Sequence, residues 1–264
     1  MSAAAKPPHP DDYPRAALVT GAGRRIGRAI ALDLARGGWA VAVHYNASAQ
    51  AAEQVVTEIE AGGGRAVALQ AELSDEARVA ALVPEATAAL GPLGCLINNA
   101  ASFENDSVET ADRASWDRHM EPNLRAPFVL TQAFARALPE AAGGAVINLL
   151  DQRVWNPTPF FLGYTLSKAG LWTLTQTLAM ALAPRVRVNG IGPGPALPSA
   201  RQTPEQFARQ CAMTPLGRGT SPEEICAAVR FILAAKAMTG QMIALDGGQH
   251  LGWAQPPAGD SIEE

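Results

Sequence analysis

Short apolar runs alternate with longer amphipathic stretches along most of the chain, and this alternation restricts the fold more than any single motif does. The amphipathic stretches have the spacing of helices that bury one face. Strands that alternate with such helices form a parallel sheet covered on both faces. We therefore predict an α/β fold, a doubly wound parallel sheet of seven strands in a single domain. The predicted strands are residues 16–20, 39–45, 65–71, 94–100, 144–150, 185–191 and 241–246.

The two ends of the chain differ in composition from this alternating part. Residues 1–14 are rich in proline and contain no apolar segment of the kind found in signal peptides, so we predict a disordered leader. Residues 252–264 are rich in Pro, Gly and acidic side chains and are predicted to form a C-terminal tail. We therefore predict that residues 15–251 form the folded domain, which is long enough to bury a substantial core.

Charge and composition exclude several kinds of partner. The formal net charge is −4 and no basic stripe is present, which argues against nucleic acid or an anionic membrane as the main partner. No apolar stretch approaches the roughly 20 residues of a membrane span. Cys95, Cys211 and Cys226 are odd in number and, like the scattered histidines, lack the spacing of metal ligands. We expect a cytoplasmic protein with reduced thiols, a small-molecule substrate and no metal.

The first predicted strand leads into a glycine-rich turn. Residues 20–27 read Thr-Gly-Ala-Gly-Arg-Arg-Ile-Gly and are followed by an amphipathic helical run. A strand, a glycine-rich turn and a helix start together favour a dinucleotide site, because glycines let the backbone approach phosphates and the helix offers free N–H groups. Gly21, Arg24, Arg25 and Ile26 are the candidate contacts. An ordinary tight turn is the alternative interpretation of this segment.

A second constellation lies near the middle of the chain. Tyr164 and Lys168 are four residues apart, so they share one face of a helix. An ammonium close to a phenol favours the phenolate, and we expect Lys168 to lower the pKa of Tyr164. Asp151 precedes Tyr164 by thirteen residues, at the end of a predicted strand. A pair such as Tyr164 and Lys168 can move a proton.

Further polar or turn-forming residues lie where other predicted strands end. Asn99 and Ala100 end the fourth predicted strand, and Pro193 and Gly194 follow the sixth. Ligands in open α/β sheets bind beyond the carboxyl ends of the strands. These four residues are therefore additional candidate cofactor contacts.

Taken together, the segments between Pro14 and Leu251 resemble the short-chain dehydrogenase/reductase family, whose members have a Rossmann fold. Within that family the chain is most similar to pteridine reductases and dihydromonapterin reductases. They have arginine where the ordinary loop has its middle glycine, as at Arg25, and aspartate in place of the usual active-site serine, as at Asp151. The segment around Phe103 also resembles theirs.

The resemblance implies a role for each of these residues. Tyr164 would give a proton to the substrate, while Lys168 would hold the nicotinamide ribose. Asn123 would support the water chain that restores the proton. Asp151 would hydrogen-bond the aminopyrimidine face of a pterin, and Phe103 would stack the flat ring against the nicotinamide. Arg25 would contact both cofactor and substrate.

Some of these residues have a second interpretation. The carboxylate of Asp151 could instead orient Tyr164 or Arg153, and Phe103 could be ordinary core packing. Apolar residues between Asp151 and Tyr164 could form a pocket wall or pack between subunits. These residues are Trp155, Pro157, Phe160, Phe161 and Leu162.

The end of the second predicted strand indicates which cofactor is used. An acid there binds the ribose hydroxyls of NAD, and the segment from Val41 to Asn46 has none. Arg24, Asn46 and Ser48 are our candidates for the 2′-phosphate, so we predict NADPH. Pteridine reductases tend to carry arginine at the position of Ala47.

Two residues after the third predicted strand are candidates for the adenine end of the cofactor. Glu72 stands where the family usually has an aspartate that contacts adenine, and Leu73 follows it. Glu72 could equally be a solvated residue before a helix start.

The predicted function is NADPH-dependent reduction of a C=N bond in a dihydropterin or dihydrofolate. A ketone or 3-oxoacyl reductase of the same family is the alternative, because residues 195–213 match no specific substrate. A cofactor-binding regulator is less well supported, since regulators of this fold typically lack the tyrosine or the lysine. The resemblance also implies a homotetramer built on the helix that contains Tyr164 and the helix before it.

Overall fold

The computed structural model describes residues 13–199 and 201–252. The predicted leader, except for Tyr13 and Pro14, lies outside these residues, and so does the predicted tail, except for Gly252.

Seven strands form one sheet in the described part of the chain, in the order β3-β2-β1-β4-β5-β6-β7, and every neighbouring pair is parallel. Every predicted strand is confirmed, with ends that agree within two residues. The strands are β1 (Ala16–Val19), β2 (Ala40–Tyr45), β3 (Ala66–Gln70), β4 (Cys95–Asn98), β5 (Gly144–Leu149), β6 (Val186–Pro193) and β7 (Met242–Leu245).

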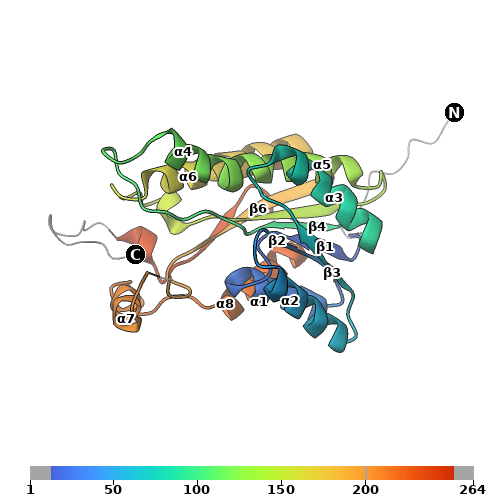
Figure 1. Ribbon diagram of the computed structural model, residues 1–264, viewed down its shortest axis with the longest axis horizontal. Coiled ribbons are helices and arrows are strands. Elements are labelled where there is room, and N and C mark those ends of the chain that lie inside the picture. The colour runs from blue at the N-terminus through green and yellow to red at the C-terminus, as the bar shows by residue number, and fades with distance from the viewer. Residues whose placement is uncertain (1–12, 200, 253–264) are drawn as a thin grey trace.

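Helices cover both faces of the sheet, with α3, α5 and α6 on one face and α1, α2 and α8 on the other (Figure 1). The helices are α1 (Arg25–Arg36), α2 (Ala49–Ala61), α3 (Glu76–Leu90), α4 (Arg113–Met120), α5 (Ala126–Ala137), α6 (Leu162–Leu182), α7 (Pro204–Ala212) and α8 (Pro222–Ala234). Shorter segments are the π-helical η1 (Glu121–Arg125) and the 3₁₀ turns η2 (Gln152–Val154) and η3 (Gln249–Leu251). None of the helices in the described ranges is long and apolar enough to cross a membrane.

The two faces have separate cores because side chains alternate along each strand. On β1, Ala16 and Leu18 belong to the core under α3, α5 and α6, whereas Ala17 and Val19 belong to the core under α1, α2 and α8. Both faces of β1 are thus buried, which explains why a central parallel strand is a continuous apolar run.

Tyr13 and Pro14 differ from the prediction of a disordered leader. The Nε of Arg187 donates a hydrogen bond to the hydroxyl of Tyr13 at 2.8 Å. Pro14 packs so closely on Gly94 that a Cβ added there would lie 2.1 Å from the Pro14 carbonyl oxygen. The packed part of the chain therefore begins at least two residues before the predicted boundary.

Replacement of Phe134 by Ala tests the core beneath α5. The ring of Phe134 is 1% exposed and lies against the backbone of Gly144, so its loss leaves a cavity. We expect the free energy of unfolding to fall by about 3–5 kcal/mol. Phe231→Ala is the matched control, because that ring is 57% exposed and its loss should change stability by less than about 0.5 kcal/mol. Urea unfolding of both variants measures the difference, and equal losses would contradict this description of the core.

Candidate functional site

A cavity of about 240 Å³ lies at the carboxyl ends of β1, β4, β5 and β6. Nine of the predicted site residues line it: Arg25, Ile26, Asn99, Phe103, Asp151, Tyr164, Lys168, Pro193 and Gly194. The other predicted site residues lie outside its lining: Gly21, Arg24, Asn46, Ser48, Glu72, Leu73, Ala100 and Asn123.

Asp151 and Tyr164 are joined at the centre of this cavity. The Tyr164 hydroxyl donates a hydrogen bond to Oδ2 of Asp151 at 2.9 Å. Asp151 directly follows the residue after β5, and its Oδ1 accepts the backbone N–H of Arg153 at 2.8 Å, so both carboxylate oxygens are held. Lys168 lies one turn along α6, and its Nζ donates to the carbonyl oxygen of Leu149 at 2.6 Å.

Burial shifts both titratable groups of the Tyr-Lys pair toward their neutral forms. The pKa of Tyr164 is raised well above its ordinary value, first by burial and then by the negative charge of Asp151. The pKa of Tyr164 is therefore raised overall and not lowered, as we had expected from Lys168, and the positive charge that opposes the increase is that of Arg153. Burial lowers the pKa of Lys168 to about 8, and the charge of Asp151 opposes that change. Tyr164 is thus a protonated acid near neutral pH.

Asn123 acts as a bridge between two segments. It lies in the π-helical turn η1 and is fully buried. Its amide accepts the N–H of Ser102 at 2.8 Å and donates to the carbonyl of Ser102 at 2.9 Å. It also donates to Oγ of Ser167 on α6 at 3.0 Å. Single π-helical turns inside helices are frequent at functional sites, and this one aims the amide at the loop after β4.

The glycine-rich turn is held from two sides. Asn99 donates from Nδ2 to the carbonyl oxygens of Thr20 and Gly21, at 2.8 and 3.3 Å. On the other side, the N–H of Gly21 donates to Nδ1 of His44 at 3.0 Å. Gly27 allows this packing, because a Cβ there would lie 2.3 Å from the Gly21 carbonyl oxygen. Sequence reasoning missed His44, which has no motif spacing relative to the loop.

Arg25 connects the glycine-rich turn to the segment after β6. Its φ angle is 53°, in the left-handed region, which explains why glycine is ordinary at this position. Its guanidinium donates to the carbonyl oxygens of Leu197 and Pro198, at 3.2 and 2.8 Å. Arg24, the N-cap residue of α1, provides no side-chain cap, so the N-terminus of this helix can receive an anion.

Two predicted cofactor residues contact each other beyond the cavity. The Asn46 side chain donates a short hydrogen bond to Oε2 of Glu72, and the N–H of Ser74 donates to Oε1 at 3.3 Å. Glu72 is therefore held in place rather than freely solvated. Its side chain thus contacts Asn46, one of the three predicted 2′-phosphate residues.

Phe103 packs against a second aromatic ring at the cavity. The rings of Phe103 and Phe161 are stacked, with centroids 4.6 Å apart and planes 4° apart, and Phe103 meets Tyr164 edge-on at 4.7 Å. The guanidinium of Arg153 lies over Phe161 at 5.0 Å. Phe161 has a φ of 57°, a strained conformation for a residue with Cβ, costing on the order of 1–3 kcal/mol. Burial of its ring between Phe103 and Arg153 offsets that strain.

The pocket wall predicted between Asp151 and Tyr164 is not formed by the expected side chains. None of Trp155, Pro157, Phe160, Phe161 and Leu162 lines the cavity, although the structure describes all five. Phe161 lies behind Phe103, and Trp155 packs edge-on against Trp172 and His250.

The segment after β6 supplies a large part of the wall, which sequence reasoning did not predict. Its turn and α7 contribute Pro195, Ala196, Leu197, Ser199, Gln202, Phe207 and Gln210. This segment carries no recognisable motif; its position depends on long-range contacts such as those of Arg25. Among the described residues, no cluster of three or more His, Cys, Asp or Glu side chains could hold a metal ion.

Comparison with known proteins shows that the chain is similar to reductases. A family model described as enoyl-(acyl carrier protein) reductase matches residues 21–250. A 3-oxoacyl-[acyl-carrier-protein] reductase, FabG, of Staphylococcus aureus is 34% identical over 242 residues, covering 90% of this chain and 98% of that protein.

Two solved structures are more similar in sequence than this relative. The FolM alternative dihydrofolate reductase 1 of Brucella canis, complexed with NADP, has a TM-score of 0.89 and 48% identity over 92% of this chain and 96% of its own. The corresponding protein of Brucella suis, in complex with NADP, has a TM-score of 0.88 and 49% identity over 91% of this chain and 96% of its own.

Replacement of Asp151 by Asn tests the electrostatic link to Tyr164. Asn keeps an oxygen that accepts a hydrogen bond but removes the negative charge, so the pKa of Tyr164 should fall toward its ordinary value. The measurement is the ultraviolet absorbance of tyrosinate as a function of pH. Because the chain has three tyrosines, Tyr164→Phe assigns the titration. Identical curves for the wild type and Asp151→Asn would contradict control by this carboxylate.

Proposed function

Because the chain belongs to the short-chain dehydrogenase/reductase family, we propose that it reduces a C=N bond of a pterin-type substrate, a dihydropterin or dihydrofolate, with Tyr164 as the proton donor. The chain is an oxidoreductase and NADPH is its cofactor. The observation that carries the pterin assignment is the hydrogen bond between Tyr164 and Asp151.

The glycine-rich turn fits a dinucleotide. The first turn of α1 has neither an acidic residue nor a side-chain cap, so its N–H groups and its dipole are available to a phosphate. Gly27 leaves no room for a side chain that would hold the backbone away from the ligand. NADPH supplies the hydride of the reaction.

Each residue of the central group has a role that follows from its position. Tyr164 is protonated and buried beside the cavity, so it can give a proton to the substrate nitrogen as negative charge develops there. Lys168 lies in the same cavity, where it would hold the nicotinamide ribose. Asn123 would support the water chain that returns a proton to Tyr164.

Asp151 selects for a substrate with N–H donors. A carboxylate accepts hydrogen bonds, and the aminopyrimidine part of a pterin presents N–H groups. A ketone presents only an oxygen acceptor, which a nearby carboxylate repels. Phe103 lies in the same cavity with its ring edge-on to Tyr164, where it can provide a platform for a flat ring.

A 3-oxoacyl reductase is the second candidate. It is favoured by the similarity to FabG over nearly the whole chain and by the Tyr-Lys pair, which suits carbonyl reduction equally well. The carboxylate of Asp151 beside the proton donor weighs against it.

We also infer a cytoplasmic homotetramer assembled through α6. This helix exposes Leu166 (43%) and Met180 (75%) in the single chain, and apolar side chains of this size are usually covered in an assembly.

A substrate panel tests the pterin proposal. NADPH oxidation is followed with dihydrobiopterin, dihydromonapterin, dihydrofolate, a small ketone and an acetoacetyl thioester. We expect turnover on the pterins. Tyr164→Phe should lower the rate of turnover about 10²–10⁴-fold, because it removes the proton donor. Asp151→Ser should lower it about 10–100-fold, because a hydrogen bond to a charged group is worth about 1.5–3 kcal/mol. Turnover on the thioester alone, unchanged in Asp151→Ser, would favour the second candidate.

Replacement of Ala47 by Arg tests recognition of the 2′-phosphate. Ala47 is exposed between Asn46 and Ser48, so an added guanidinium can reach the phosphate without disturbing the core. An exposed ion pair between this guanidinium and the 2′-phosphate should stabilise bound NADPH by about 1 kcal/mol, which corresponds to a decrease of about fivefold in its KM. The KM for NADH should not fall, and an equal decrease for both cofactors would mean that the phosphate lies elsewhere.

A further inference from the structure

Asp106 caps the helix that carries Tyr164. Oδ1 of Asp106 accepts the N–H of Gly163 at 2.9 Å, and its backbone carbonyl accepts the N–H of Leu162 at 3.3 Å. Phe161, the N-cap residue of α6, contributes no side-chain cap. The first two N–H groups of α6 are therefore satisfied by a residue more than 50 positions earlier, and the next residue is Tyr164.

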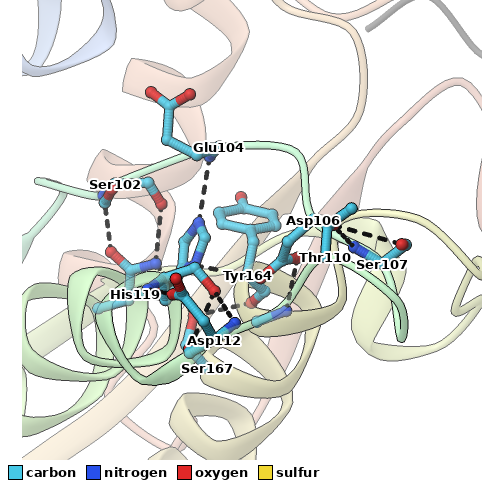
Figure 2. Close-up of polar contacts among 12 residues, drawn as sticks. Ser102, Glu104, Asp106, Ser107, Thr110, Asp112, His119, Tyr164 and Ser167 are labelled. Carbon is cyan, nitrogen blue, oxygen red and sulfur yellow. Dashed lines mark hydrogen bonds and ion pairs between the residues drawn. The ribbon is translucent and has the colours of Figure 1, made fainter.

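Asp106 belongs to the loop after β4, and His119 of α4 contacts the same loop from the protein interior (Figure 2). It is fully buried, and its Nε2 accepts the N–H of Glu104 at 3.1 Å. Its Nδ1 lies 2.9 Å from the carbonyl oxygen of Ser115, which can only accept, so the ring is assigned the Nδ1–H tautomer. The ring also meets Tyr164 edge-on at 6.4 Å.

Gly163 lies between these two side chains and leaves no space. A Cβ added at Gly163 would lie 2.7 Å from Oδ2 of Asp106 and 2.8 Å from Nδ1 of His119. Those two atoms are 3.8 Å apart. The first turn of α6 thus rests directly on the pair formed by Asp106 and His119.

These contacts also hold the loop that contains Phe103, because they fix every second residue of that loop. Asn123 fixes both backbone groups of Ser102, His119 fixes the N–H of Glu104, and Asp106 is fixed by α6. Phe103 therefore lies between anchored neighbours, with its ring centroid 4.7 Å from that of Tyr164.

We propose that Asp106 and His119 are positioning residues that set the distance between the proton donor Tyr164 and the aromatic platform Phe103. The proposal rests on the proposed function, which gives those two residues their roles. Neither Asp106 nor His119 lines the cavity, so the pair acts by fixing the start of α6 and the loop after β4 relative to each other.

The chemistry of Asp106 supports a role beyond helix capping. A serine next to the helix would cap α6, as Ser221 caps α8. Asp106 instead is 4% exposed and keeps its Oδ2 buried without a hydrogen-bond partner among the described residues. Burying a carboxylate in this way is unfavourable. In return, Asp106 connects the loop after β4 to the start of α6, which a capping residue next to the helix cannot do.

Asp106→Ala and Asp106→Asn form the primary test. Asn retains an oxygen for the N–H of Gly163, whereas Ala retains none. We expect Asp106→Ala to lower kcat/KM for the pterin about 10–100-fold, because kcat falls and the KM for the pterin rises. The Kd for NADPH should change less than about twofold. Asp106→Asn should recover most of this loss. Asp75→Ala is the matched control, since Asp75 caps α3 through the N–H groups of Ala77 and Arg78.

A second pair of variants provides an independent test if Asp106→Ala does not fold. In His119→Gln the amide oxygen can take the place of Nε2 and accept the N–H of Glu104, whereas the shorter His119→Asn cannot reach it. We expect His119→Asn to lose about tenfold more pterin kcat/KM than His119→Gln, with similar Kd values for NADPH. Equal kinetics for the two variants would count against the proposal.

Three outcomes overturn this inference. Wild-type kcat/KM in Asp106→Ala would do so, as would a parallel loss of NADPH binding and melting temperature without rescue by Asn. A kinetic loss in Asp75→Ala equal to that in Asp106→Ala would mean that any lost helix cap has the same effect. Tyr164→Phe separates this inference from the proposed function: if Tyr164→Phe is inactive and Asp106→Ala is normal, only the positioning role fails.

Discussion

The hydrogen bond between Tyr164 and Asp151 is the interaction on which the site depends, because it joins two elements that no local sequence brings together. Asp151 lies just beyond β5, and Tyr164 lies in the first turn of α6. The bond forms only if the sheet ends and the helix begins in the right places. The contacts of Asp106 and His119 with the start of α6 therefore bear directly on proton transfer.

Burial decides the protonation states at this centre. In water, an ammonium beside a phenol lowers the pKa of the phenol, because the positive charge stabilises the phenolate. Here both side chains are nearly inaccessible, and the carboxylate of Asp151 opposes ionisation of Tyr164. The tyrosine consequently holds its proton, which suits the proposed role of an acid that gives up its proton only when the substrate nitrogen gains negative charge.

Sequence patterns predicted the sheet better than they predicted the site. All seven strands were predictable because each contains a short apolar segment between two amphipathic stretches. Tyr164, Lys168 and Arg25 belong to recognisable local spacings. His44, Asp106 and His119 were missed because the contacts that connect them to the site join residues 15 to 57 positions apart, and no spacing in the sequence encodes them. The pKa of Tyr164 was predicted in the wrong direction because burial, which follows from tertiary packing, outweighs the neighbouring charge.

The relatives alone do not choose the substrate, since FabG and the FolM proteins share the fold and both are named as reductases. Our proposal of a pterin follows from what a carboxylate can do beside a proton donor. A carbonyl substrate needs hydrogen-bond donors around its oxygen, and Asp151 offers only acceptors while it is ionised. A pterin provides its own N–H donors to that carboxylate and leaves the Tyr164 proton for the reduced nitrogen. The same geometry that makes Asp151 unsuitable for a ketone therefore makes it suitable for an aminopyrimidine.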